Sequence, residues 1–427
     1  MRNLKGFKLI LLFGIILVLF SCQKKELNVE KSTEKYTVKL VPEILARKIA
    51  ERIPIEFLSK ENYINNKSAF TIQDKEISDS VIIPDAYDNP ALYVYNYSEG
   101  NGFIVISADV RHEPICAYVE TGRFQADTVP GTLVEWFDAT IENIEMLRND
   151  AFENTDRANY AWYRTLEETE LMDLNNYLKL MPIDDPAPPC DEGWNTIVRG
   201  PLLATQWGQG CTFNEACPDE SCTNPCFGNT RTVTGCVSTA VSQILRFWEH
   251  PNQFNYNYTS MPNNQGNGEV QRMMFDVGDA VGMNWGCINS GAQDWKVDDA
   301  FKEDFDFESA TGPTFLNQSN WNASSYLTVK SNLNNSWPVL LGGYSTRTNV
   351  FLGIIHFPQE GHLWVCDGYS AISNYCYGYL YFHMNWGWNE VIGGNNNNFN
   401  GWFAFNNWNP ETRTFKYLRD YIYDIYP

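Results

Sequence analysis

Apolar residues recur at helical intervals in the segment that follows Gly235 and Cys236. They fall at Val237, Ala240, Val241, Ile244, Leu245 and Trp248, which is the spacing of one buried helical face. Thr234 suits the N-cap position and Pro251 follows the C-terminal end, so Cys236 is expected in the first turn of a helix. Unpaired amide N–H groups and the helix dipole stabilise a thiolate there, and the thiolate is the nucleophilic form of cysteine. Taken alone, an isolated free cysteine is more often a small buried hydrophobe.

Two strand-like segments lie far downstream of this helix. One alternates between apolar and polar residues from His362 to Tyr369, the other is an aromatic run from Tyr377 to Trp386, and Ser370–Cys376 joins them. Alternation and aromatic enrichment are typical of strands, and the short connection favours an antiparallel hairpin.

The register of this hairpin decides which side chains meet. If Tyr369 pairs with Gly378, His362 lies directly opposite Asn385 on the same face, with Cβ atoms roughly 5 Å apart. The Asn385 amide would then fix the tautomer of His362 while the other ring nitrogen meets Cys236, an arrangement that activates a cysteine nucleophile. The register is an assumption, since a slip of one residue moves every side chain to the other face.

These residues belong to four motifs in a characteristic order, and through them the chain resembles the streptopain family of cysteine peptidases. The motifs are Trp207-Gly-Gln209-Gly210, Gly235-Cys236-Val-Ser-Thr-Ala240, Gly361-His362 leading to Val365-Cys-Asp367-Gly368, and His383-Met-Asn385-Trp386-Gly387-Trp388. The resemblance covers residues 91–124 and 200–405. It implies an α+β fold: a papain-like peptidase domain with a helical part and an antiparallel β part, preceded by a small α+β pro-domain that inhibits it.

The resemblance also implies a role for each site residue. Cys236 would be the nucleophile, His362 the general base and acid, and Asn385 the residue that orients His362. The Gln209 side chain would complete the oxyanion hole together with the backbone N–H of Cys236, and Trp386 would shield the His–Asn pair from water. These roles predict hydrolysis of protein or peptide substrates with neither a cofactor nor a metal.

His383 is the one rival base. It would share a strand face with Asn385, but its place in the family motif favours His362 as the base.

The region before the peptidase motifs has the pattern of a separate α+β unit, and we assign residues 38–183 to the pro-domain. Strand-like segments are expected at 91–97, 100–111 and 115–119, and helical spacing occurs at 41–58, 132–146 and 156–180. The proline-rich segment 181–190 is unlike the interior of an element. We therefore expect a linker with the maturation site at 184–199, because exposed chain is easily cut, and a catalytic domain at 200–427.

The first residues predict export. Arg2, Lys5 and Lys8 precede the apolar run 9–20, which leads into Ser21-Cys22. A basic start followed by a short apolar run is a secretory signal, and its end resembles a bacterial lipoprotein signal. We expect residues 1–21 to be removed, Cys22 to be lipidated, and 22–37 to be a polar tether. The precursor would then be held at the bacterial cell envelope, with possible release of the mature domain. The alternative is an ordinary signal peptide with an incidental cysteine.

Charge and cysteine content refine this hypothesis. The net charge of −21, from 52 acidic and 31 basic residues, argues against nucleic acid as a partner. An exported chain permits disulfides, and the candidates are the clustered Cys211, Cys217, Cys222 and Cys226. A four-thiolate zinc site is the alternative, but the spacing lacks paired C-x-x-C knuckles. Cys366 and Cys376 are not expected to bond to each other, since the assumed register separates them.

Two other classes of function remain open from the sequence. One is a non-catalytic surface lipoprotein, such as a protease inhibitor or a glycan-binding module, which would not need the Cys-His-Asn set. The other is a Cys-His amidase or transglutaminase, because nucleophile and base do not specify the acyl group.

Overall fold

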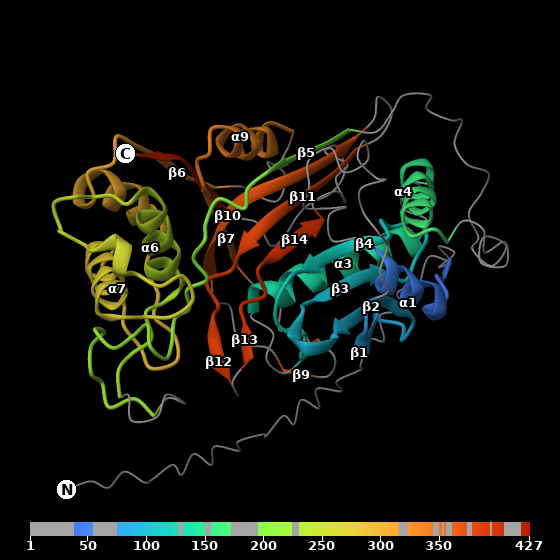
Figure 1. Ribbon diagram of the computed structural model, residues 1–427, viewed down its shortest axis with the longest axis horizontal. Coiled ribbons are helices and arrows are strands. Elements are labelled where there is room, and N and C mark those ends of the chain that lie inside the picture. Colours follow the sequence, from blue (N-terminus) through green and yellow to red (C-terminus); the bar gives the residue numbers. More distant parts are fainter. Residues whose placement is uncertain are drawn as a thin grey trace, which may run out of the picture. The chain divides into compact units, whose positions relative to one another are not determined.

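An antiparallel sheet runs through the pro-domain and the catalytic domain of the computed structural model (Figure 1). Its strand order is β1-β2-β3-β4-β14-β11-β10-β7-β15-β6, and β5 pairs with β10 beside this path. The strands are β1 Ile77–Pro84, β2 Pro90–Tyr97, β3 Phe103–Ser107, β4 Ile115–Val119, β5 Asn195–Arg199, β6 Ser309–Phe315, β7 Val339–Tyr344, β10 Gly361–Ser373, β11 Gly378–Asn385, β14 Gly401–Ala404 and β15 Asp420–Tyr426. Two small ladders pair β8 Val350–Phe351 with β9 Ile354–Ile355, and β12 Glu390–Ile392 with β13 Asn395–Asn397.

Helices accompany both parts of the sheet. They are α1 Glu43–Arg52, α3 Gly131–Arg148, α4 Thr155–Glu168, α6 Cys236–Trp248, α7 Gly268–Ala280, α8 Val297–Asp299 and α9 Ala323–Asn334. Shorter helical turns are η2 Ser98–Gly100, η3 Tyr258–Ser260, η4 Asp294–Lys296 and the π-helical η5 Ala300–Asp304. None of the helices in the described residues has the length and apolar character that a bilayer span requires.

The structure describes residues 38–53, 75–126, 131–149, 155–171, 195–223, 230–315, 323–344, 350–351, 354–355, 361–373, 378–392, 395–404 and 420–427. The predicted signal segment 1–21, Cys22 and the tether 22–37 lie outside these ranges, as do residues 184–194 of the predicted linker.

The pro-domain strand β2 is buried on both faces because two sets of helices cover it. Tyr93, Tyr95 and Tyr97 belong to one hydrophobic cluster with α1, and their hydroxyls donate to backbone carbonyls of Val41, Glu43 and Ala50. The alternate residues Leu92 and Val94 belong to a second cluster that includes α3. Side chains of a strand point to opposite faces in turn, so the nearly continuous apolar sequence of β2 contributes alternate side chains to two hydrophobic clusters.

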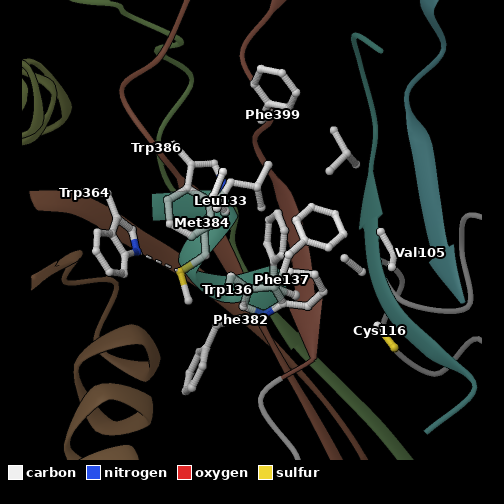
Figure 2. Packing of buried hydrophobic residues seen from close by; sticks show 14 of the residues in the cluster. Val105, Cys116, Leu133, Trp136, Phe137, Trp364, Phe382, Met384, Trp386 and Phe399 are labelled. Carbon is white, nitrogen blue, oxygen red and sulfur yellow. Dashed lines mark hydrogen bonds between the residues drawn. The ribbon is translucent and has the colours of Figure 1, made fainter. Parts of the chain in front are cut away.

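The junction between pro-domain and catalytic domain is a pair of strands. Val119 and Ala117 of β4 pair with Gly401 and Phe403 of β14, and one hydrophobic cluster contains residues from both domains. Trp136 of α3 packs edge-on against Phe403, with ring centroids 5.2 Å apart. Figure 2 shows side chains of α3 lying among those of β11 within this cluster. The two domains therefore share a sheet and a core, which the sequence did not predict.

Most predicted elements are confirmed, with three corrections. Strands at 90–97, 103–107 and 115–119 and the helix at 131–148 match the expectations. The helix expected at 156–180 runs from Thr155 to Glu168, and residues 172–180 lie outside the described ranges. The first helix ends at Arg52 rather than at residue 58, because Ile53 precedes Pro54 and adopts an extended conformation, as residues before proline favour. Residues 195–199 are not exposed linker: they form β5, which pairs with β10.

We predict that Trp136→Ala lowers the free energy of unfolding of the full chain by about 3–5 kcal/mol. Trp136 is 3% exposed in the shared core, and truncation leaves a cavity there. Urea denaturation measures the change. Trp295, which is 52% exposed, supplies the matched control, because exposed substitutions usually change stability by less than about 0.5 kcal/mol. Equal effects of the two substitutions would contradict a shared core at Trp136.

Candidate active site

Cys236 is the first residue of α6, as predicted. The N-cap residue is Gly235 rather than Thr234, and it has a positive φ of 83°. A Cβ at Gly235 would clash with the backbone oxygen of Ser290, so glycine is required on both conformational and steric grounds. Thr234 instead contacts the hydroxyl of Thr239 at 3.0 Å. The Thr234 side chain thus braces the start of the helix without capping it.

The structure brings Cys236 and His362 together. Burial by itself raises the pKa of the Cys236 thiol, but the charge of His362, its side-chain hydrogen bond and the backbone amides of Leu363 and Val237 outweigh burial and lower the pKa. Cys236 remains partly exposed to solvent. A partly exposed cysteine with a lowered pKa is poised to act as a nucleophile.

A backbone carbonyl fixes the orientation of His362. The Nε2 atom of His362 lies 3.0 Å from the carbonyl oxygen of Trp386. A carbonyl can only accept, so Nε2 carries the proton and Nδ1 is left to interact with the Cys236 thiol. The imidazole also stacks near Trp364 and meets Trp388 edge-on, with ring centroids 6.2 and 5.9 Å apart.

The predicted hairpin is confirmed, but its assumed register is wrong. Tyr369 pairs with Phe382 rather than with Gly378. A bulge between Cys366 and Gly368 shifts the register again, so Val365 lies opposite Asn385. Because bulges insert an unpaired residue into one strand, a constant register could not reproduce this pairing. His362 and Asn385 are therefore not cross-strand partners.

Asn385 holds the peptide that contacts His362, not the imidazole itself. Its Oδ1 accepts the backbone N–H of Gly387 at 3.3 Å, and that N–H belongs to the same peptide unit as the Trp386 carbonyl. The Asn385 Nδ2 donates to the carbonyl of Thr205 at 2.7 Å, and its amide also bonds to Gln243. The predicted direct Asn385–His362 contact is corrected to one that acts through a peptide group.

The Trp386 side chain lies in the core, and its predicted role in shielding the His–Asn pair stays a prediction. It is 1% exposed and packs against Trp364 and Phe403, with ring centroids 5.0 and 5.2 Å apart. The rings of Trp364 and Trp388 lie beside His362. The sequence did not predict that Trp364 lies beside His362, because Trp364 is one of several aromatic residues in strand-like segments.

Gln209 lies close to the start of α6 in the structure. Its backbone carbonyl accepts the N–H of Thr234 at 2.9 Å, two residues before Cys236. Its side-chain Nε2 donates to the carbonyl of Gly387 at 3.4 Å. These two hydrogen bonds connect Gln209 both to the start of α6 and to the segment that holds His362, and its role as an oxyanion donor stays a prediction.

His383, the rival base, belongs to a different buried pair. Its Nδ1 lies 2.6 Å from Oδ1 of Asp367, and the other carboxylate oxygen accepts the N–H of Leu203 at 3.0 Å. Burial lowers the pKa of His383, but the charge and hydrogen bond of Asp367 outweigh it, and the net pKa is raised. His383 therefore helps to anchor the start of the catalytic domain.

The cysteine cluster matches the prediction only in part. Cys222 is bonded to Cys287, 65 residues away in sequence, with a Cα–Cα distance of 5.2 Å. Cys211 is also disulfide-bonded, whereas Cys217 is a free, buried thiol. Cys226 lies outside the described residues. The four-thiolate zinc alternative is excluded because Cys211 and Cys222 are in disulfides. Cys366 is a free thiol, so it is not bonded to Cys376, as expected.

Comparison with known proteins agrees with this geometry. The model of the Peptidase C10 family matches residues 207–269 and 252–400, and that of the Spi protease inhibitor matches residues 42–144. Residues 207–400 of the chain are therefore similar to the C10 cysteine peptidases, in agreement with the resemblance to the streptopain family. This homology supports cysteine-type endopeptidase activity.

Individual relatives are distant. The chain is 24% identical over 336 residues to the thiol protease/hemagglutinin PrtT of Porphyromonas gingivalis, covering 71% of this chain but only 33% of PrtT. It is 23% identical over 390 residues to streptopain of Streptococcus pyogenes, covering 81% of this chain and 83% of streptopain. A solved fragment of Prevotella intermedia prointerpain A superposes with a TM-score of 0.50 at 20% identity, covering 81% of this chain and 98% of the fragment. The predicted α+β papain-like fold with a pro-domain is confirmed.

We predict that His362→Ala raises the pKa of the Cys236 thiol. The substitution removes the charge and the side-chain hydrogen bond of His362, which lower this pKa, and leaves the burial that raises it, so less thiolate forms at a given pH. Mass spectrometry can follow the rate at which iodoacetamide alkylates Cys236 at a series of pH values. The curve of alkylation rate against pH should therefore shift to higher pH in His362→Ala.

His383→Ala is the matched control, because His383 pairs with Asp367. It should leave the alkylation profile in place. A profile that moved in His383→Ala and stayed in His362→Ala would reverse the two assignments.

Proposed function

We propose that this chain is a cysteine endopeptidase, made as a zymogen, that hydrolyses protein or peptide substrates through an acyl-enzyme on Cys236. The observation that carries the proposal is the hydrogen bond between Cys236 and His362, together with the lowered pKa of the thiol. No cofactor or metal takes part in the proposed chemistry.

In the first half of the proposed reaction, the Cys236 thiolate attacks the carbonyl carbon of the scissile peptide. The His362 imidazolium then donates its Nδ1 proton to the leaving amine, and the acyl-enzyme forms. In the second half, neutral His362 takes a proton from water, which attacks the thioester and releases the acid. The Trp386 carbonyl holds Nε2–H throughout, so one ring nitrogen is reserved for proton transfer.

The developing oxyanion would be bound by the Gln209 amide and the backbone N–H of Cys236. Two donors aimed at this position supply electrostatic stabilisation that grows as the carbonyl becomes negative. The hydrogen bond between the Gln209 carbonyl and Thr234 supports this role, because it keeps Gln209 beside the helix that carries the nucleophile.

Asn385 would orient His362 through the Trp386–Gly387 peptide. Its bond to the Gly387 N–H fixes the plane of the peptide whose carbonyl receives His362. Shielding from water, assigned to Trp386 on sequence grounds, fits the rings of Trp364 and Trp388 better, because these lie next to the imidazole.

We assign residues 38–183 to an inhibitory pro-domain that acts on its own catalytic domain. The match of residues 42–144 to the protease-inhibitor family supports this assignment. We place the maturation cut within 184–194, because residues 195–199 are part of the sheet and paired backbone resists proteolysis.

The N-terminal segment adds a membrane anchor to the proposal. Removal of residues 1–21 would expose Cys22 for lipidation, and the precursor would be held at the bacterial cell envelope by its pro-domain side. Every proposed catalytic residue lies beyond the cut, so maturation would release the active domain from its lipid.

Cys236→Ala should abolish hydrolysis of labelled casein under reducing conditions, because it removes the nucleophile. Cys366→Ala is the control: this thiol is also free, but it is fully buried in β10, and its loss should leave most of the activity. Casein hydrolysis by the Cys236 variant at the wild-type rate would rule out the proposed mechanism.

Maturation should separate the catalytic domain from the membrane. In cells producing the wild type, antibodies against residues beyond 200 should detect a soluble fragment whose N-terminus lies within 184–195. If maturation is autocatalytic, Cys236→Ala should accumulate at full length in the membrane fraction. A mature fragment that still partitions with membranes after reduction and removal of the pro-domain would contradict this placement of the anchor.

A further inference from the structure

A tight turn at residues 398–400 reaches the peptide that orients His362. The side-chain Oδ1 of Asn400 accepts the backbone N–H of Trp386 at 3.0 Å. The next peptide along, between Trp386 and Gly387, is the one that accepts from His362 and is held by Asn385. The Trp386 backbone is therefore bound on both sides, and Asn400 supplies one of the two side-chain acceptors.

The turn itself is held in a demanding conformation. Phe399 has a positive φ of 55°, which a bulky side chain adopts only when its surroundings impose it. The Oδ1 of Asn398 accepts the N–H of Asn400 at 3.0 Å and so closes the turn locally. Asn398 and Asn400 are 1% and 8% exposed.

Contacts from the pro-domain support the turn from its other side. The ring of Phe399 meets that of Phe103 in β3 at 6.2 Å, and the hydroxyl of Thr121 donates to Asn398 at 3.3 Å. Directly after the turn, β14 pairs with β4. The turn is thus fixed on a framework, which lets it position another group accurately.

We propose that Asn400 is a positioning residue for His362, acting through the backbone of Trp386. The proposal rests on the proposed function, because it assigns Asn400 to the same catalytic pair. Loss of the acceptor would leave the Trp386 N–H buried without a partner, which is unfavourable. The backbone would rotate to regain a hydrogen bond, and the carbonyl that holds Nε2 of His362 would move with it.

A purely structural role makes a different prediction. If Asn400 only stabilised the fold, its loss would lower the melting temperature and leave the chemistry of Cys236 unchanged. If it positions His362, the ion pair with Cys236 weakens and the thiol titrates at higher pH. Small displacements of catalytic groups have large effects on rate, so the two roles separate in the pH profile.

The test compares Asn400→Ala and Asn400→Asp in the full chain, where the turn keeps all its contacts. Iodoacetamide alkylation of Cys236 is followed by mass spectrometry across pH, and melting is measured in parallel. Asn400→Ala should move the alkylation profile to higher pH and slow alkylation roughly tenfold at neutral pH, as expected for the loss of one buried hydrogen bond. Asn400→Asp keeps an acceptor oxygen and should retain a profile close to that of the wild type.

Asn332→Ala is the matched control. Asn332 is 2% exposed, and its Oδ1 also accepts a backbone N–H, that of Asp424, at 2.7 Å. Its loss should lower the melting temperature without moving the alkylation profile. If Asn400→Ala does not fold, Asn398→Ala takes its place, because it removes the bond that closes the turn and should shift the profile in the same direction.

The outcomes distinguish this inference from the function beneath it. An unshifted profile in a folded Asn400→Ala or Asn398→Ala chain, with Cys236 of the wild type reactive at low pH, overturns the positioning role alone. A shift of equal size in Asn332→Ala also overturns it. A wild-type chain whose Cys236 titrates like an ordinary thiol overturns the proposed function, and the inference with it.

Discussion

The peptide between Trp386 and Gly387 is the constraint on which the site depends. Its carbonyl oxygen accepts from Nε2 of His362, and its N–H is bound by Asn385. A backbone carbonyl has no proton to give, so this single contact sets both the tautomer and the direction of the imidazole. The pKa of Cys236 is lowered chiefly by that imidazole. The fraction of Cys236 that is thiolate therefore depends, through His362, on how this peptide is held.

This peptide directly follows β11, a strand inside the sheet, and segments distant in sequence therefore surround it and hold it in place. Asn385 bonds to Thr205 and Gln243, and Gln243 also accepts the N–H of Trp207. These bonds join the segment that enters the catalytic domain, the helix α6 and the strand β11. Buried polar groups of this kind favour one arrangement when all are satisfied, so the network specifies the site as much as it stabilises it.

The pro-domain is continuous with the structure behind the site. Trp136 contacts Phe403, and Phe403 contacts Trp386, so a pro-domain side chain is two contacts away from the residue that orients His362. The Cys236–His362 pair is assembled in the chain that still carries its pro-domain.

Local sequence was sufficient where a feature depends on neighbouring residues. The helical spacing after Cys236, the alternation around His362 and the aromatic run before Asn385 predicted α6, β10 and β11, because side-chain periodicity follows from backbone geometry alone. The order of four motifs was sufficient for the family. Together they predicted Cys236 and His362 as the catalytic pair.

Tertiary structure decided what depends on distant partners. The hairpin pairs Tyr369 with Phe382, so Val365 rather than His362 lies opposite Asn385, and no alternation pattern fixes where a hairpin turns. Cys222 bonded to Cys287 rather than within its own cluster, because disulfides require close Cα atoms and not close positions in sequence. Strand β4 joined β14 across the boundary between two predicted domains. Periodicity shows which face of an element is buried, but the partner that covers it, and hence the peptide that holds His362, is set by packing across the whole chain.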